Sequence, residues 1–373
     1  ALDLASETEE KLKQAQDDFL EAIKENEKPP KKPSKKAITS AGLAFDEEMD
    51  EATTRRIIDQ QLVDAGWEAD SIKLRHARGT RPKHGRNLAI AEYPTASGPA
   101  DYVLFVGLIP IASIEAKRNN TDVAGKIPQA QRYSLDFTAP ESTTPAYEVE
   151  GRTLPWPDDA EGYYHLPFVY SSNGRPFVKQ IKEKSGTWFR DTRKPSNIKR
   201  PLHSFHSPEG LLDLLKGSKE NAEKELQKEG FAYLKLRDYQ QKAIQKVETA
   251  LENGKTECLL AMATGTGKTR TIVGLMYRFL KAERFKRILF LVDRTALGDQ
   301  ALDTFREAPL EQNQTLSTIY NVAELGDMAV EAETRIHVST VQAMVQRIFN
   351  SNATPNVDAY DCIIVDEAHR GYT

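Results

Sequence analysis

The chain has 373 residues, 39% of them hydrophobic and 28% charged, and it carries a net charge of −4. This length and composition predict a globular protein of two or three domains. No apolar run approaches the ~20 residues of a membrane span, and because the N-terminal stretch is acidic and polar we expect no secretory signal. A mildly acidic chain can bind nucleic acid only through local basic patches. Cys258 and Cys362 lie in apolar runs, so we expect buried, reduced thiols of a cytoplasmic protein rather than a disulfide or zinc framework.

The N-terminal part of the chain predicts an amphipathic helix at residues 7–25, followed by a linker rich in proline and lysine. A second helix is expected at residues 47–62. The segment 71–91 then holds six Lys or Arg residues and no acid, with glycine and proline punctuating it. Such a segment is either a loop that contacts a nucleic-acid backbone or an ordinary exposed loop, and both interpretations stay open.

The next part of the chain has the pattern of a mixed α/β domain. The expected strands are residues 87–93, 101–107, 111–117 and 165–171, and the expected helices are residues 125–137 and 207–215. The basic stretch 179–200 includes Trp188 and Phe189 and fits either a second DNA-facing surface or a solvated hairpin. The polar stretch 216–230 marks a domain boundary.

From residue 231 onward helices and strands alternate, which is typical of a nucleotide-binding α/β domain with a parallel sheet. The expected strands are residues 256–261, 287–292, 335–339 and 361–365, and the expected helices are residues 237–252, 269–281, 297–305 and 341–348.

A phosphate-binding loop is predicted at residues 265–269, which read Gly-Thr-Gly-Lys-Thr between an apolar run and a stretch with helical spacing. The glycines let backbone N–H groups close around phosphate oxygens, and the helix N-terminus adds a partial positive charge. Lys268 is expected to reach the β- and γ-phosphates of ATP, and Thr269 to ligate Mg²⁺. Met262 replaces the first glycine of the general G-x-x-x-x-G-K-[ST] pattern, a departure that the helicase version tolerates.

A second strand end supports the same site, because the apolar residues 361–365 lead directly into Asp366 and Glu367. An acid at a strand end can hold Mg²⁺ through water, and its neighbour can activate the attacking water. Together with the phosphate loop, this acid pair predicts nucleotide binding.

Asp101, Glu115 and Lys117 form a second candidate site. Glu115 and Lys117 are two residues apart in an expected strand and therefore point to the same face, and a short turn could bring Asp101 beside Glu115. Two carboxylates and a lysine on one face can hold Mg²⁺ and polarise a water for attack on phosphate, whereas the alternative is a surface salt bridge. Because charges in an otherwise apolar strand need a partner or a metal, we favour the metal site. On the following helix Gln129 and Tyr133 share one face.

This order of Asp, Glu-x-Lys, Gln-x-x-x-Tyr and a helicase-type phosphate loop resembles the restriction (R) subunit of type I restriction–modification enzymes, from about residue 47 to the end. The resemblance implies an α/β fold: a PD-(D/E)-x-K nuclease-like α/β domain, then the first lobe of a RecA-like parallel-sheet motor. It implies that Asp101 and Glu115 bind Mg²⁺ and that Lys117 assists the attacking water. Pro99 and Asp101 are separated by Ala100 here, a one-residue departure from the Pro-Asp dipeptide of the family.

The resemblance also implies three supporting residues for the nuclease site. Glu51 matches an early-helix acid that supports the site, and Gln129 and Tyr133 match the Q-x-x-x-Y element that positions DNA or the metal site.

The C-terminal part resembles superfamily 2 helicases. The residues that this resemblance implies for ATP binding are Arg237, Gln240 (the expected adenine reader), Gly265, Thr266, Gly267, Lys268 and Thr269. Residues 366–369 match a DEAH motif, with Asp366 expected at Mg²⁺ and Glu367 expected to be catalytic. Arg294, Ser339 and Thr340 are expected to face the DNA backbone. A second lobe and its arginine fingers are absent from the sequence, so we expect this chain to bind ATP but to hydrolyse it poorly.

Three parts are therefore expected: residues 1–45 as helix and linker, 46–225 as endonuclease domain and 226–373 as an incomplete motor lobe, in a chain that we take for a fragment at both ends. The implied function is ATP-driven translocation on double-stranded DNA with metal-dependent cleavage. The implied cofactors are ATP and Mg²⁺ in both sites, with S-adenosylmethionine only through a partner. The implied partners are double-stranded DNA and the modification (methyltransferase) and specificity subunits, with no membrane.

Three alternatives stay open: a helicase whose decayed nuclease domain only binds nucleic acid, a non-catalytic scaffold, and a nuclease–helicase of another restriction or repair class such as type III. The chain order counts against type III, because here the nuclease precedes the motor.

Overall fold

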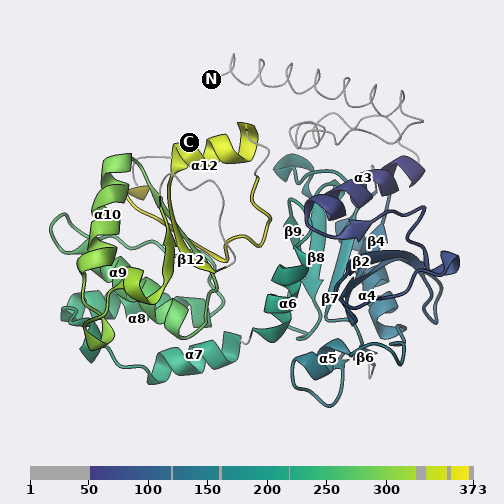
Figure 1. Cartoon of the computed structure of the whole chain (residues 1–373), viewed down its shortest axis with the longest axis horizontal. Helices are drawn as coiled ribbons and strands as arrows, with labels where there is room; N and C mark the ends of the chain where they lie inside the picture. The colour runs from purple at the N-terminus through teal and green to yellow at the C-terminus, as the bar shows by residue number, and fades with distance from the viewer. Residues whose placement is uncertain are drawn as a thin grey trace. The chain divides into compact units, whose positions relative to one another are not determined.

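The structure is a computed structural model that describes residues 51–118, 121–158, 162–217, 219–324, 333–350 and 354–368. The helix expected at residues 7–25 and its linker lie outside these residues. The chain divides into two compact units, drawn in Figure 1. The first unit runs to Lys216 and includes Asn356–Asp358; the second comprises Gly217–Pro355 and Ala359–Thr373. Among the described helices, none has the length and apolar character to span a membrane.

The first unit is built on a seven-stranded mixed sheet with the strand order β1-β2-β3-β4-β7-β8-β9, and β5 pairs separately with β6. The strands are β1 Glu68–Ala69, β2 Asn87–Tyr93, β3 Ala100–Val106, β4 Ile109–Ala116, β5 Trp156–Pro157, β6 Tyr163–Tyr164, β7 Phe168–Ser172, β8 Thr187–Asp191 and β9 Arg200–Leu202. The helices are α3 Glu51–Asp64, α4 Ile127–Leu135, α5 Ala146–Val149 and α6 Pro208–Lys216, with short 3₁₀ turns η1 His76–Arg78, η2 Ala124–Lys126 and η3 Lys179–Lys184.

Helices cover both faces of the central strands of this sheet. Ile58 of α3 and Leu211 of α6 belong to the same apolar cluster as Ala89 of β2, whereas Leu88 of β2 packs in a second cluster with Tyr133 of α4. Successive residues of a strand point to opposite faces, so β2 supplies both clusters in alternation. Burial on both faces explains why β2 reads as a nearly continuous apolar run rather than as an alternating pattern.

Two segments of the first unit differ from the expectations. The strand expected from residue 165 begins at Phe168, because the preceding backbone bonds to α4 instead of the sheet: the His165 N–H donates to the Ser134 carbonyl and the Leu166 N–H to Ser134 Oγ. The stretch 179–200 contains the inner strand β8, which pairs with both β7 and β9. Trp188 is 8% exposed and Phe189 only 3%, so neither a solvated hairpin nor a DNA-facing surface describes these two side chains.

The second unit contains a four-stranded sheet with the order β11-β12-β10-β13, in which all described pairs are parallel. The strands are β10 Ile288–Val292, β11 Asn321–Ala323, β12 Thr334–Thr340 and β13 Cys362–Val365. The helices are α7 Lys219–Lys228, α8 Asp238–Glu252, α9 Lys268–Lys281, α10 Thr295–Glu307, α11 Leu316–Ile319 and α12 Val341–Asn350, with 3₁₀ turns η4 Ala232–Leu234 and η5 Glu311–Asn313.

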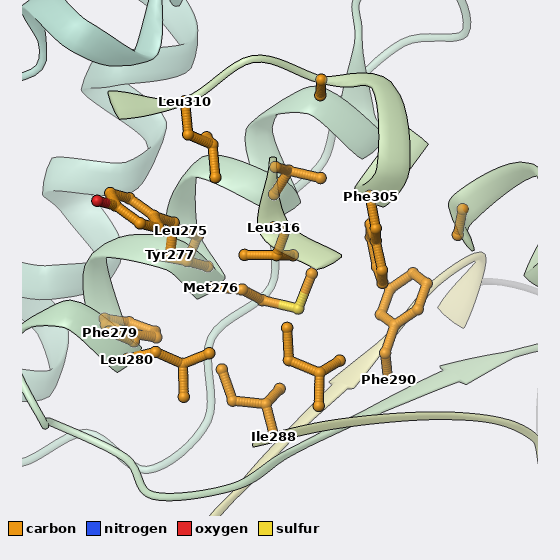
Figure 2. Close-up of a cluster of buried hydrophobic side chains, with 14 of the residues drawn as sticks. Leu275, Met276, Tyr277, Phe279, Leu280, Ile288, Phe290, Phe305, Leu310 and Leu316 are labelled. Atoms are coloured by element: carbon orange, nitrogen blue, oxygen red, sulfur yellow. The ribbon is translucent and has the colours of Figure 1, made fainter. Parts of the chain in front are cut away.

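Helix α9 lies in the core of this unit (Figure 2). Met276 and Leu280, four residues apart on one helical face, point toward Ile288 of β10, and Phe290 of the same strand meets Phe305 of α10. Because α9 begins at Lys268, directly after the Gly-Thr-Gly turn, this packing fixes the helix whose N-terminus adjoins the predicted phosphate loop.

The strand expected at residues 256–261 is not formed. This segment has no regular structure, Leu259 is 85% exposed, and Cys258 is exposed rather than buried as expected. A strand needs a neighbour for its backbone hydrogen bonds, and the described sheet ends at β13 without pairing to this segment. Cys362 in β13 is partly covered, and burial, followed by the charge of Asp361, raises the pKa of its thiol to about 12.

Candidate functional site

The register of β3 and β4 places Asp101 level with Glu115, because Tyr102 pairs with Ile114 in the adjacent position. Lys117 follows the end of β4, and its backbone N–H donates to the Ser172 carbonyl of β7 at 2.9 Å. Asp101, Glu115 and Lys117 all line one cavity of ≈ 270 Å³. The fold therefore brings the three residues of the Asp and Glu-x-Lys pattern together, although Asp101 lies on β3, Glu115 on β4 and Lys117 just after β4.

Glu115 is a charged group inside the protein. Its side chain is 0% exposed and forms an ion pair with the Lys117 ammonium, which is 27% exposed. Apart from that ion pair, the two Glu115 oxygens receive no hydrogen bond from the described residues. Because a buried carboxylate needs more compensation than one partly exposed ammonium gives, the Glu115 oxygens suit a cation in the cavity.

Asp101 is held by donors on both of its oxygens. The Arg55 guanidinium of α3 donates to Oδ1 at 2.6 Å, and the backbone N–H of Ala116 donates to Oδ2 at 2.8 Å. Burial, and then the neighbouring Glu115 carboxylate, nevertheless raises the pKa of Asp101 to about 6. The repulsion between the two carboxylates is of the kind that a bound divalent cation relieves.

Helix α4 presents Gln129 and Tyr133 to the same cavity. The Gln129 side-chain amide donates to the Tyr133 hydroxyl at 3.0 Å. Burial raises the pKa of Tyr133, and the nearby Glu115 and Asp101 carboxylates raise it further, so the hydroxyl keeps its proton. Glu51 begins α3, but its side chain lies outside the part of the chain that the structure describes.

The described residues contain no group of three or more His, Cys, Asp or Glu side chains arranged to hold a metal ion. A cation in this cavity would therefore take two carboxylates from the protein and complete its shell with water and substrate oxygens. Mg²⁺ is commonly bound in this way, because it keeps several waters and uses one or two carboxylates together with phosphate.

The sequence analysis missed three charged residues of this site. Arg55 bonds both Asp101 and Glu92, and the exposed Arg118 lines the cavity beside Lys117. Glu92 carried a usable signal, since it is the only charged residue in the apolar strand β2. Arg55 carried none, because a charged residue on an amphipathic helix normally indicates a solvated face.

The phosphate loop of the second unit has the backbone that its glycines require. Gly265 and Gly267 have φ values of 78° and 80°, in the left-handed region, and α9 begins directly afterwards at Lys268. The Lys268 ammonium donates to Glu367 Oε1 at 2.6 Å, across 99 positions of sequence. The loop and the acid at the end of β13 therefore meet at one place, as expected of a nucleotide site.

Gln240 is bound to the loop rather than free. Its Oε1 accepts the Arg237 backbone N–H at 2.9 Å, and its Nε2 lies 3.1 Å and 3.2 Å from the Thr266 and Gly267 carbonyls. Tyr239 also donates to the Thr266 carbonyl, at 2.7 Å. The Gln240 side chain thus holds the loop in place in this structure, and the contact with adenine that we expect of Gln240 stays a prediction.

The other expected residues of the second unit differ in exposure. Thr269 and Asp366 are half-buried, and the Arg294 side chain is 74% exposed beside Asp293. Ser339 is 3% exposed and its hydroxyl donates to the Thr340 carbonyl, so its side chain lies inside the lobe while Thr340 is half-buried. A DNA contact is therefore easier for Arg294 and Thr340 than for Ser339.

The two units together have the architecture of a nuclease-like α/β domain followed by a helicase-like nucleotide-binding lobe. Residues 68–215 match the family model "Type I restriction enzyme EcoKI endonuclease subunit second domain", and residues 233–373 match "Type III restriction enzyme, res subunit". These two matches correspond to the two units.

Endonuclease subunits of type I restriction enzymes are also similar in sequence to most of the chain. It is 43% identical over 361 residues to the type I restriction enzyme EcoKI endonuclease subunit of Escherichia coli K12, a match that covers 90% of this chain and 30% of that protein. It is 28% identical to the EcoAI endonuclease subunit of Escherichia coli, covering 83% of this chain and 34% of the relative. Among solved structures it matches a fragment of a putative HsdR subunit of a type I restriction enzyme from Vibrio vulnificus YJ016, with 22% identity, 86% and 52% coverage and a TM-score of 0.26.

Both units therefore match restriction-enzyme families, and over most of its length the chain is similar to the endonuclease subunits of type I restriction enzymes. It spans about a third of the length of the first two relatives.

Proposed function

We propose that this chain is the nuclease and first motor lobe of an ATP-dependent enzyme that moves along double-stranded DNA and cuts it. The observation that carries the nuclease assignment is the meeting of Asp101, Glu115 and Lys117 at one cavity, with the Glu115 carboxylate fully buried. Burying one carboxylate beside another costs free energy unless a cation is present. A surface salt bridge, the alternative interpretation, therefore does not explain this arrangement.

In this proposal Asp101 and Glu115 would hold Mg²⁺, which would stabilise the negative charge at the phosphate and make the attacking water more acidic. The Lys117 ammonium orients the attacking water from the rim of the cavity. The Gln129 amide fixes the Tyr133 hydroxyl beside Glu115, and Glu51 is assigned a supporting role. Attack of the water oxygen on phosphorus, with rupture of the bond to the leaving sugar oxygen, completes the hydrolysis.

For the motor lobe, the proposal assigns ATP to the loop that precedes α9. The loop N–H groups, Lys268 and Thr269 would hold the phosphates and Mg²⁺, with Asp366 at the metal and Glu367 activating water. Phosphate would take the place that Glu367 now occupies on Lys268. The remaining assignments are Arg237 and Gln240 near the base and Arg294, Ser339 and Thr340 near the DNA backbone.

Partners follow from the family rather than from the geometry. The relatives are named as endonuclease subunits of restriction enzymes, so we propose modification and specificity subunits as partners. We propose the cytoplasm as the location, because both DNA and ATP are available there. Any S-adenosylmethionine would be bound by such a partner.

The test is cleavage of supercoiled plasmid by the complete subunit, assembled with its partners, in the presence of Mg²⁺ and ATP. Lys117→Ala should lower cutting by about 100-fold or more and leave ATP hydrolysis intact, whereas Lys268→Ala should abolish both. Lys216→Ala is the matched control, because Lys216 is an exposed lysine of the same unit that lies outside the cavity and outside the basic segments 71–91 and 179–200. Normal cutting by Lys117→Ala would mean that the Asp101, Glu115 and Lys117 cluster is structural.

A further inference from the structure

The C-terminal end of β2 has a backbone irregularity at Glu92, beside the proposed metal site. The ladder between β2 and β3 pairs Ala91 with Tyr102 and Tyr93 with Ala100. Between these pairs, Glu92 lies opposite Asp101 but has φ = 50°, in the left-handed region. A non-glycine residue in this conformation is strained, and such backbone strain is common at functional sites.

The side chain of Glu92 receives two arginines. Its Oε1 accepts from Arg55 at 3.1 Å, and its Oε2 accepts from Arg75 at 3.0 Å. Arg55 uses its other terminal nitrogen for Asp101 Oδ1, at 2.6 Å. One guanidinium therefore bridges the proposed metal ligand Asp101 and the irregular residue Glu92.

This bridge places the positively charged Arg55 guanidinium against Asp101, the carboxylate that a bound cation would need as a ligand. Arg55 and Asp101 are both largely buried, at 15% side-chain exposure each, so solvent screens their interaction less than at the surface. Asp101 Oδ2 is already bonded to the Ala116 N–H, which leaves Oδ1 as the oxygen for which Arg55 and a cation compete. Glu92 offers Arg55 a second acceptor within reach.

We propose, building on the proposed metal site, that Arg55 is a positioning residue that occupies Asp101 Oδ1 until Mg²⁺ binds and then stays on Glu92. Arg55 thereby opposes metal binding, and Glu92 favours it by neutralising and retaining Arg55. Arg55 and Glu92 together set the affinity of the site for the metal ion, and removing one of them should have the opposite effect to removing the other. A purely structural ion pair between α3 and the sheet would make both variants weaken the site or leave it unchanged.

The experiment titrates the nucleotide-free 373-residue chain with Mn²⁺ and follows the paramagnetic resonance signal of the free ion. Glu115→Gln identifies which bound Mn²⁺ belongs to the nuclease cavity. At that site Arg55→Met should bind Mn²⁺ about 3- to 10-fold more tightly than the parent chain, and Glu92→Gln about 3- to 10-fold more weakly. Arg55→Lys, which keeps the charge, should stay within about twofold, as should the exposed control Lys73→Met.

Opposite shifts for Arg55→Met and Glu92→Gln support the inference. Weaker or unchanged binding by Arg55→Met, with the Glu115-dependent site present, overturns it. If Arg55→Met does not fold, unchanged binding by Glu92→Gln, whose side chain is one-third exposed, overturns it equally. Equal numbers of bound Mn²⁺ in Glu115→Gln and the parent chain would overturn the metal site itself, a separate result from failure of the Arg55 role.

Discussion

At the scale of single residues, Gly267 has a backbone conformation on which the proposed phosphate loop depends. Its φ of 80° is in the left-handed region, and a Cβ there would lie 2.7 Å from Gln240 Nε2, the amide that braces the loop. A side chain at this position must therefore move Gln240 and strain the backbone together.

We expect Gly267→Ala to weaken ATP binding by about 10-fold or more, measured by fluorescence anisotropy of a labelled ATP analogue. Gly254→Ala is the matched control: Gly254 has nearly the same φ, 76°, but nothing lies within 4 Å of its missing Cβ. Equal loss of binding in both variants would show that backbone strain, and not the contact with Gln240, is responsible.

A second residue-scale effect is the buried imidazole of His206. It shares a 2.7 Å hydrogen bond with the Tyr170 hydroxyl, and burial, followed by the charge of Arg200, lowers its pKa to about 3. The folded His206 therefore stays neutral at pH values where the unfolded chain, with a pKa near 6.5, takes up a proton.

Because the folded pKa is depressed, the contribution of His206 is complete above about pH 6.5 and is lost as the pH falls toward 3. Lowering the pH from 7 to 5 should cost the first unit roughly 2 kcal/mol through this group. In His206→Gln this loss should disappear, so the difference in unfolding free energy between parent and variant should shrink on acidification. Urea denaturation at both pH values measures it, and a constant difference would contradict the prediction.

At the scale of elements, Arg278 joins three helices of the second unit. Its side chain is 0% exposed on α9, bonds Glu248 of α8 at 2.7 Å and donates to the Leu226 carbonyl of α7 at 2.8 Å. The guanidinium also stacks on Phe231, 4.0 Å from the ring centroid. Arg278 lies in the C-terminal half of α9 and thus anchors the helix that follows the proposed phosphate loop.

Arg278→Met should destabilise the second unit by about 3 kcal/mol, because it leaves Glu248 and the carbonyls of Leu226, Glu229 and Gly230 without this buried donor. Chemical denaturation followed by the fluorescence of a bound nucleotide analogue reports this. Arg306→Met removes an arginine of the same unit whose side chain is 50% exposed, and it should change stability by less than about 0.5 kcal/mol. A comparable loss in Arg306→Met would show that the charge, not the burial, is what matters.

At the scale of the whole chain, the two units have separate apolar clusters. The cluster around α9 and β10 shares no described residue with the clusters on the two faces of the seven-stranded sheet. A unit with its own core can unfold by itself.

Calorimetry of the chain should therefore resolve two transitions. Arg278→Met should lower the midpoint of one of them, and His206→Gln at pH 7 the midpoint of the other. A single transition that both variants shift equally would mean that the units unfold as one body.

Most of the elements, and the order of a nuclease-like unit before a helicase-like unit, could be predicted from the sequence. Strand β2 was expected at residues 87–93 and is found there, because burial on both faces leaves an apolar run bounded by turn residues. The stretch 256–261 has an equally apolar composition but forms no strand, because composition does not supply a hydrogen-bonding neighbour.

The sequence by itself determined the local chemistry: a Glu-x-Lys pair on one strand face, a Gly-Thr-Gly turn before a helix and an acid pair after an apolar strand. These features follow from spacing, since neighbours in sequence are held at fixed distances by the backbone. Only the tertiary structure decided that Asp101 stands level with Glu115, that Lys268 meets Glu367, and that Arg55 and Glu92 surround the proposed metal site. Those contacts depend on strand register and helix packing, which arise from interactions across 14 to about 100 positions of sequence.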